Sequence, residues 1–305
     1  MKQEGSVWLH RFAMLTAFAT FLLIIAGALV VGHDAGLSVP DWPLSYGKLM
    51  PRMTGNIFYE HGHRMIAGLV GVLTTVLAVW LWRAERRAWV RWLGITAVFA
   101  VILQAVLGGI TVLYLLPIPV LVGHACLAQL FFCMTVGLAV FTGPAWNSVA
   151  PVEDDRFPAF RHIACGTTAA IYIQLILGAA RRHKALGLLP HVIWAGVVAV
   201  FVMWMLYHAL NKLPQSQKAL RGLSSFAGGL VVLQLALGYG SYWTRLVTQG
   251  APQPEPAMIN VTTAHVATGA LLLGTCLIVT LLSYRRLPGS VREMSFTRNP
   301  QKKFA

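Results

Sequence analysis

Eight long apolar stretches constrain this chain more than any other feature of its sequence. A helix that crosses the hydrocarbon core of a bilayer needs roughly 20 mostly apolar residues, and within lipid only helices and closed barrels satisfy their own backbone groups. The sequence therefore predicts an all-α polytopic membrane protein. The expected transmembrane helices lie near residues 12–32, 62–82, 92–115, 120–142, 162–181, 190–210, 223–243 and 258–283.

Composition excludes several other classes of protein. Hydrophobic residues make up 57% of the chain and charged residues only 11%, which is incompatible with a disordered chain or a nucleic-acid-binding domain. Four cysteines are too few for a disulfide scaffold. All four lie in apolar runs, where a thiol is usually a packing residue, and they are Cys126, Cys133, Cys165 and Cys276.

The Lys and Arg residues predict the orientation in the membrane. With the N-terminus inside, seventeen of the 24 basic residues fall on the cytoplasmic side, so the positive-inside rule predicts cytoplasmic termini in the cell (inner) membrane. The net charge of +14 then implies contact with anionic membrane lipid, including a basic tail after Arg285. The first apolar run is too long for a signal peptide and is expected to be retained as a span. The acidic run 153–155 is expected to be a solvated connector.

Two halves of the chain repeat each other. The pattern Gln-x-x-Leu-Gly starts at Gln104, Gln174 and Gln234, and a histidine is followed four and five residues on by Ala-Gly at His63 and His191. Because four helices separate the copies, the repeat is parallel, with a pseudo-two-fold axis along the membrane normal. We expect two pseudo-symmetric four-helix bundles, formed by residues 1–150 and 151–305.

Four of the ten histidines lie at the same outer level of the predicted membrane. His63 and His124 belong to the first half, and His191 and His265 to the second. Ionisable residues inside a membrane are costly and usually functional, and haem iron accepts one imidazole from each of two facing helices. Two pairs of metal-ligating histidines would hold two haems. A zinc or copper site with more ligands and hydrogen-bonded structural histidines are the alternatives.

Basic residues on the outer side suit the carboxylates of haem. Arg64, Arg181 and Arg182 could bind the two propionates, because a guanidinium offers a bidentate fork of donors. The alternative is that their side chains simply extend to lipid headgroups. Arg64 is the best placed of the three, since it directly follows His63.

The two halves differ beside their first histidine. Glu60, His61 and Arg64 surround His63, whereas apolar residues surround His191. We therefore expect catalysis in the first half, with Glu60 as an acid/base or radical-stabilising group beside His63 and His124. The second half would be a closed electron-transfer centre. Alternatively, Glu60 is only a carboxylate favoured by the dipole at a helix N-terminus.

Two motifs resemble those of the haem A synthase family of eight-helix membrane haemoproteins. Residues 60–64 read EHGHR, similar to the E-H-x-H-R signature of the family, and residues 36–43 read GLSVPDWP, similar to its G-L-S-C-P-D-W-P loop. The resemblance covers roughly residues 10–285. It implies oxidation of a methyl group of haem O to the formyl group of haem A, with substrate in the first half and a bis-histidine haem b in the second.

Carried over residue by residue, the resemblance implies a role for each member of the two pairs. His63 and His124 would face the substrate haem O and the product haem A, and His191 and His265 would ligate haem b. A haem O synthase is the expected partner, because it would hand over a hydrophobic intermediate. The electron donor, the oxidant and the oligomeric state stay open, a homo-oligomer included.

The sequence departs from the family pattern in two places. Val39 stands where many bacterial members have the first cysteine of a pair, and residues 33–59 contain no cysteine. The outer loop near 181–190 is also shorter than is usual in the family. Two other functions therefore stay open, namely a dihaem b-type electron-transfer cytochrome and a non-catalytic haem-binding transporter or assembly relative.

Overall fold

The structure is a computed structural model in which residues 7–147, 151–252 and 254–288 are described. These residues form nine helices, and eight of them are long and apolar enough to cross a membrane, so all eight predicted spans are confirmed. The first half contains α1 (Val7–Gly32), α2 (Asn56–Ala84), α3 (Ala88–Leu113), α4 (Ile118–Thr142) and the short α5 (Pro144–Asn147). The second contains α6 (Phe160–Arg182), α7 (Leu188–Asn211), α8 (Lys218–Val247) and α9 (Pro256–Arg286).

Several helices extend beyond the apolar windows that predicted them. Helix α2 begins at Asn56, directly after Gly55, whose φ of 54° stops the helix from starting earlier. Residues 60 and 61 are therefore helical, although the apolar window began at 62. The window marks only the part of a helix that sits in hydrocarbon, and the hydrogen-bonded backbone continues into the polar interface.

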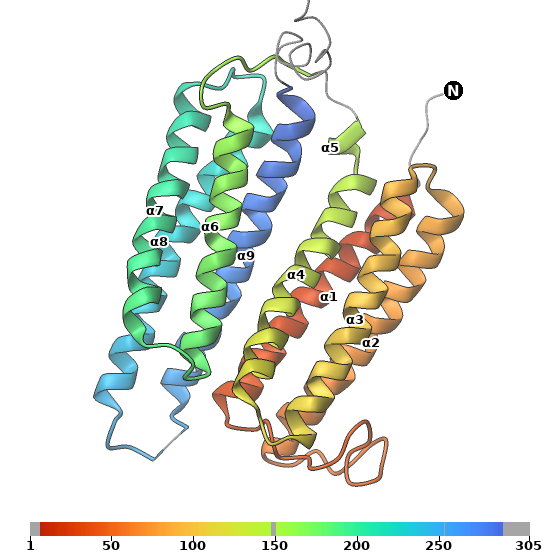
Figure 1. Cartoon of the computed structure of the whole chain (residues 1–305), viewed down its shortest axis with the longest axis vertical. Helices are drawn as coiled ribbons and strands as arrows, with labels where there is room; N and C mark the ends of the chain where they lie inside the picture. The colour runs from red at the N-terminus through yellow and green to blue at the C-terminus, as the bar shows by residue number, and fades with distance from the viewer. Residues whose placement is uncertain (1–6, 148–150, 253, 289–305) are drawn as a thin grey trace, which may run out of the picture.

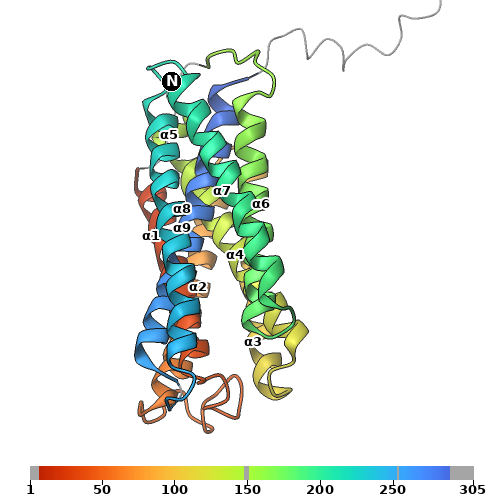
Figure 2. The same ribbon diagram turned by 90° about the vertical axis from the view of Figure 1, so that its left-hand side faces the viewer.

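The long helices form two bundles that lie side by side (Figure 1), one from α1–α4 and one from α6–α9. Helices α1 and α4 of the first bundle contact α9 of the second, and α4 also contacts α6. Figure 2 shows that all of them run along the long axis of the molecule. Helix α9 lies at this seam, since 67% of its apolar window is buried, compared with 17% for α7 on the outside.

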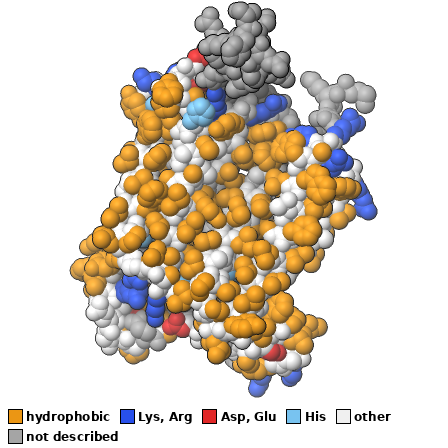
Figure 3. Space-filling view, in the orientation of Figure 1, with side chains coloured by type: hydrophobic (Ala, Val, Ile, Leu, Met, Phe, Trp, Pro, Cys, Tyr) orange, Lys and Arg blue, Asp and Glu red, His pale blue; other side chains and the backbone are white. Residues whose placement is uncertain are grey.

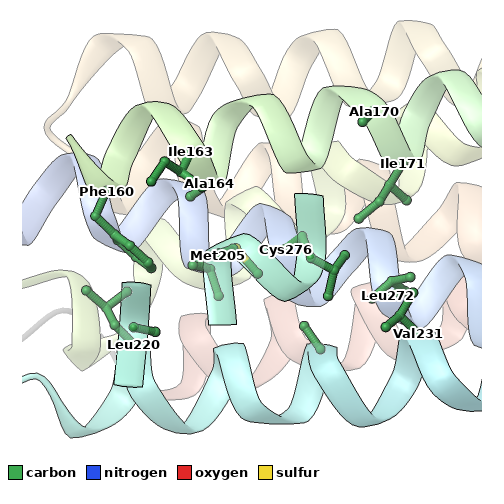
Figure 4. Close-up of a cluster of buried hydrophobic side chains, with 14 of the residues drawn as sticks. Phe160, Ile163, Ala164, Ala170, Ile171, Met205, Leu220, Val231, Leu272 and Cys276 are labelled. Carbon is green, nitrogen blue, oxygen red and sulfur yellow. The ribbon is translucent and has the colours of Figure 1, made fainter. Parts of the chain in front are cut away.

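Each bundle has its own apolar core. Figure 4 shows that of the second bundle, where Phe160, Met205, Leu220 and Cys276 are fully buried. The core of the first bundle is built around residues such as Leu77, Leu81 and Phe131. A smaller cluster joins the two bundles across the seam, and it consists of Ile24, Phe132, Val136 and Ala270.

The outer surface of the bundles is apolar. Hydrophobic side chains cover the middle of the molecule, and most Lys and Arg side chains lie toward its two ends (Figure 3). Large apolar residues such as Phe99 and Val200 are about two-thirds exposed, at 68% and 67%, which would be costly in water but suits lipid. The chain is an integral membrane protein.

The connector between the bundles differs from its expected solvated state. The N–H of Val152 donates to the carbonyl of Arg286 (2.8 Å), and that of Asp154 donates to the carbonyl of Pro288 (3.1 Å). Asp154 is buried, and its carboxylate accepts the N–H of Phe160 at the start of α6 (2.9 Å). The expectation was wrong for Asp154, because a helix N-terminus attracts a carboxylate even where water is excluded. The expected boundary at residue 150 and the tail after 288 lie outside the described residues.

Candidate functional site

In the first half, both predicted histidine ligands pack against a glycine of the preceding helix. The ring of His63 on α2 lies over Gly27 on α1, so that a Cβ on Gly27 would be 3.2 Å from His63 Cε1. The ring of His124 on α4 lies over Gly108 on α3, with a corresponding distance of 3.5 Å. The two rings are close enough to interact electrostatically. A larger residue at either glycine would crowd the imidazole.

The second half repeats the same arrangement on equivalent helices. His191 on α7 packs against Gly178 on α6, and His265 on α9 packs against Gly238 on α8. In both cases a Cβ on the glycine would come within 3.1 Å of the histidine Cε1. The last glycine of the repeated Gln-x-x-Leu-Gly motif is thus the position on which the imidazole rests.

The histidine pair of the second half has a spacing that suits one metal ion. The ring centroids of His191 and His265 are 6.3 Å apart, with ring planes at 77°. Two nitrogen–metal bonds of about 2 Å each, plus the part of each ring beyond its nitrogen, place the centroids about 6 Å apart. The pair therefore fits an iron held between two axial imidazoles.

Glutamine side chains of the same motif contact this pair. Gln174 Nε2 donates to the backbone carbonyl of His191 (3.0 Å), and Gln234 Nε2 lies 3.4 Å from Nε2 of His265. Nδ1 of His265 lies 3.2 Å from the carbonyl oxygen of Gln234. A backbone acceptor at Nδ1 selects the tautomer in which Nε2 is unprotonated, so that its lone pair can accept from Gln234 or ligate a metal.

Several polar atoms around the two pairs are buried without a hydrogen-bond partner among the described residues. On the histidines they are the Nδ1 atoms of His63, His124 and His191. On the arginines they are Nε of Arg181 and Nη1 of Arg182. Burying a guanidinium nitrogen without an acceptor costs about 1–3 kcal/mol, so the two arginines favour a bound anionic group. No cluster of three or more His, Cys, Asp or Glu side chains occurs within the described ranges. Pairs of histidines with nearby arginines fit haem better than zinc.

The two arginines at the end of α6 lie near the second pair. Arg181 is within electrostatic range of His191, and Arg182 within range of His265. This placement is compatible with the predicted propionate contacts, which stay predictions. The loop after them is as short as expected, because α7 begins at Leu188.

A long loop, residues 33–55, covers one end of the first bundle and lies at the bottom of Figure 1. Its Trp42 ring rests on Gly109, where a Cβ would come within 2.7 Å of the ring, one residue from the glycine beneath His124. Asp41 accepts the N–H groups of Tyr46 (2.7 Å) and Gly47 (2.8 Å). These two bonds stabilise the carboxylate and lower the pKa of Asp41 from its ordinary value.

Glu60 joins this loop to α2. One oxygen of its buried carboxylate accepts the N–H of Val39 (2.8 Å), and the other accepts from Arg64 Nη2 (2.6 Å). Nη1 of Arg64 donates to the loop carbonyls of Asp41 (2.7 Å) and Leu44 (2.9 Å). The pair therefore has a clear structural role. The predicted catalytic role of Glu60 and the propionate contact of Arg64 stay predictions.

Sequence reasoning missed two features of the site. The first is the loop contact of the buried His61, whose Nδ1 lies 2.8 Å from Ser45 Oγ. The second is the role of the glycines. The repeated Gln-x-x-Leu-Gly motif could have pointed to three of them, but at the equivalent position of α1 Gly27 is preceded by Leu23 in place of the glutamine.

Comparison with known protein families decides the wider assignment. The profile of the cytochrome oxidase assembly protein family matches residues 10–192, more than half of the chain. The chain belongs to this family. The match includes loop 33–55 and the first three of the four histidines.

Individual family relatives are similar over shorter segments. A haem A synthase of Geobacillus kaustophilus is 29% identical over 180 residues, which cover 57% of this chain and 56% of the relative. Those of Lysinibacillus sphaericus and Roseobacter denitrificans are 36% identical over 110 residues and 34% identical over 154 residues. These two segments cover 35% and 46% of this chain, and 36% and 39% of the relatives. The matched segments thus span between about a third and three fifths of the relatives' lengths.

Proposed function

We propose that this family member is a haem A synthase, which oxidises a methyl group of haem O to a formyl group within the membrane. The observation that carries the proposal is the repeated frame of two histidine pairs, each ring resting on a glycine of the preceding helix. Each half offers two nitrogen ligands from facing helices, as one haem requires. The name of the relatives, haem A synthase, supports this chemistry.

The second half would hold haem b as the resident cofactor. His191 and His265 would hold its iron, given their 6.3 Å centroid separation, and Arg181 and Arg182 would bind its propionates. Bound there, haem b would supply electrons to the first half. The protein's own part is to fix the two imidazoles on Gly178 and Gly238 and to place cationic donors beside them.

The first half would bind haem O as the substrate. His63 and His124 would hold its iron, and the cover formed by loop 33–55 would keep bulk water from the reacting edge. Glu60 would stabilise charge or exchange a proton near the methyl group, with Arg64 and the Val39 N–H orienting its carboxylate. Conversion of the methyl to a formyl group is a four-electron oxidation that would need an external oxidant. Two successive hydroxylations by that oxidant would give a geminal diol, which loses water to form the formyl group. The apolar helix surfaces suit the long isoprenoid tail of the substrate.

The orientation and partners form part of the same proposal. The basic residues favour cytoplasmic termini in the cell membrane, and in that orientation both histidine pairs and loop 33–55 would lie near the outer side. Haem O synthase is the partner that would deliver the substrate. Anionic lipid would contact the basic inner surface.

A dihaem electron-transfer cytochrome is the second candidate. It is favoured by the likeness of the two histidine pairs and by the carboxylate of Glu60, both oxygens of which already have protein partners. This function predicts two permanent haems b per chain. A synthase predicts one haem b and a second site that exchanges haem O or haem A.

The experiment that separates them is haem analysis of the purified protein. The chain is produced together with a haem O synthase, and its haems are extracted with acid and identified by chromatography and mass. Haem A or its hydroxylated precursor, absent from a His63→Ala variant, would support the synthase. Haem b alone at two per chain, with haem O available, would support the cytochrome.

A further inference from the structure

The side chain of Arg182, in the second half, donates a hydrogen bond to α1 of the first half. It is the last residue of α6, and its Nη2 donates to the carbonyl oxygen of Ala28 at 2.9 Å. Ala28 directly follows Gly27, the glycine on which the His63 ring rests. The arginine therefore holds the part of α1 that positions a proposed substrate ligand.

The other terminal nitrogen of Arg182 has no such contact. Nη1 is buried and has no hydrogen-bond partner among the described residues. The carboxylate of Asp34 is within electrostatic range, but no salt bridge joins the two side chains in the described part of the chain. A buried guanidinium nitrogen without an acceptor is costly, so this N–H fits an anionic oxygen from a bound molecule.

The surroundings of Arg182 indicate which molecule this is. His265 of the second pair is within its electrostatic range, and the neighbouring His183 is within range of both Arg182 and His124. The guanidinium is thus bonded to α1 next to the glycine beneath His63 and is also near His265 of the second pair. Haem carries two carboxylates at one edge, and Arg is well suited to bind them.

We propose that Arg182 couples the two haem sites, with Nη1 binding a propionate of the haem held by His191 and His265 while Nη2 holds the Ala28 carbonyl. Occupancy of the second half then fixes the guanidinium, and through it the segment of α1 beneath His63. Arg182 is thus a positioning residue for the substrate site, supplied by the other half of the molecule. This inference rests on the proposed function, because it requires haem in both halves.

The test uses the full-length protein in detergent, loaded with haem b and haem O. Arg182→Gln, Arg182→Lys and the control Arg245→Gln are compared, since Arg245 is an exposed basic residue at the end of α8. Two quantities are measured, namely the haem O retained per haem b after washing and the midpoint potential of haem b. Neither measurement depends on turnover.

In Arg182→Gln we expect haem O retention to fall by at least about tenfold, because one charge-assisted contact is lost on each side of the seam. The midpoint potential should also fall, since a positive charge near the iron is removed. Arg182→Lys keeps the charge but not the planar fork, so the potential should stay near the wild-type value while retention still falls. Arg245→Gln should change neither.

Unchanged haem O retention in Arg182→Gln would overturn the coupling, even if the potential moved. If Arg182→Gln does not elute as a folded protein, the retention in Arg182→Lys decides the same question. A wild-type protein that binds haem in neither half would instead refute the proposed function, so the two failures are distinguishable.

Discussion

The two halves share one frame of histidines resting on glycines but differ in what covers it. In each half the first and third helices supply a glycine and the second and fourth supply the histidine that rests on it. Above this frame, the first half carries loop 33–55, which Glu60 and Arg64 join to α2. In the equivalent place, between its first two helices, the second half has the much shorter turn 183–187. The helices thus set the placement of the histidines in both halves, and we expect the proposed difference in chemistry to come from the cover.

The largest expected effect comes from removing one histidine of each pair. His191→Ala should remove the low-spin bis-histidine absorption of haem b, because one axial ligand is lost. His63→Ala should keep that absorption and abolish haem A formation. Optical spectra and extracted haems measure both. If His63→Ala removed the bis-histidine signal and His191→Ala kept it, the roles of the halves would be reversed.

The next largest effect tests Glu60, which joins loop 33–55 to α2 in the first half only. Glu60→Gln keeps an acceptor for the Val39 N–H but loses the charge, so the yield of haem A should fall at least about 100-fold while haem content is retained. Glu85→Gln is the matched control, because Glu85 is also paired with an arginine, at 2.7 Å from Arg87, but lies between α2 and α3, away from the histidines. Unchanged activity in Glu60→Gln would leave Glu60 with its structural role alone.

A smaller effect tests whether the frame is the same in both halves. Gly238→Ala adds a Cβ 3.1 Å from the His265 ring, and Gly27→Ala adds one 3.2 Å from His63. Each should cost about 1–3 kcal/mol of overpacking and lower haem occupancy in its own half only. Gly229→Ala and Gly68→Ala are the controls, since an added Cβ there meets nothing within 4 Å. Equal losses in controls and test variants would mean that the glycines matter only for helix packing in general.

The smallest expected effect is a loss of folding stability at acidic pH. Burial, followed by the nearby Arg182 and His124, lowers the pKa of His183 to about 4 from its ordinary 6.5. Between pH 4 and 6.5 the unfolded chain therefore binds more protons than the folded protein, and the free energy of unfolding should fall as the pH drops through this range. Allowing for partial solvent screening, the loss is about 1–2 kcal/mol.

The same pH dependence compares the turn 183–187 of the second half with loop 33–55 of the first. His183→Gln should remove this loss of stability, whereas Asp41→Asn should not. Because the pKa of Asp41 is lowered from its ordinary value of 3.8, the stability that its carboxylate contributes is lost mainly below pH 3.8. Melting temperatures in detergent across the pH range measure both variants. A wild-type melting temperature that is constant between pH 6.5 and 4 would contradict the prediction for His183.

Much of this architecture was predictable because the bilayer imposes it. The thickness of the hydrocarbon sets the length of each span, and the cost of burying an ionisable group makes a histidine such as His124 conspicuous in an apolar run. Helix ends were less predictable, because hydropathy does not show that α2 begins as early as Asn56. The contacts of Glu60 and the buried state of Asp154 depend on segments far apart in the chain, and local patterns contain no information about them.

The connector has a consequence for the order in which the chain is synthesised. Its residues Val152 and Asp154 bond to Arg286 and Pro288 at the end of α9, so the second bundle closes at this end only after its last helix has left the ribosome. The first bundle consists of helices that emerge earlier, and domains generally fold as they are completed. During insertion, α1 and α4 must therefore expose to lipid the surface that α9 later covers, and the nascent chain passes through a stage with one finished bundle beside an open one.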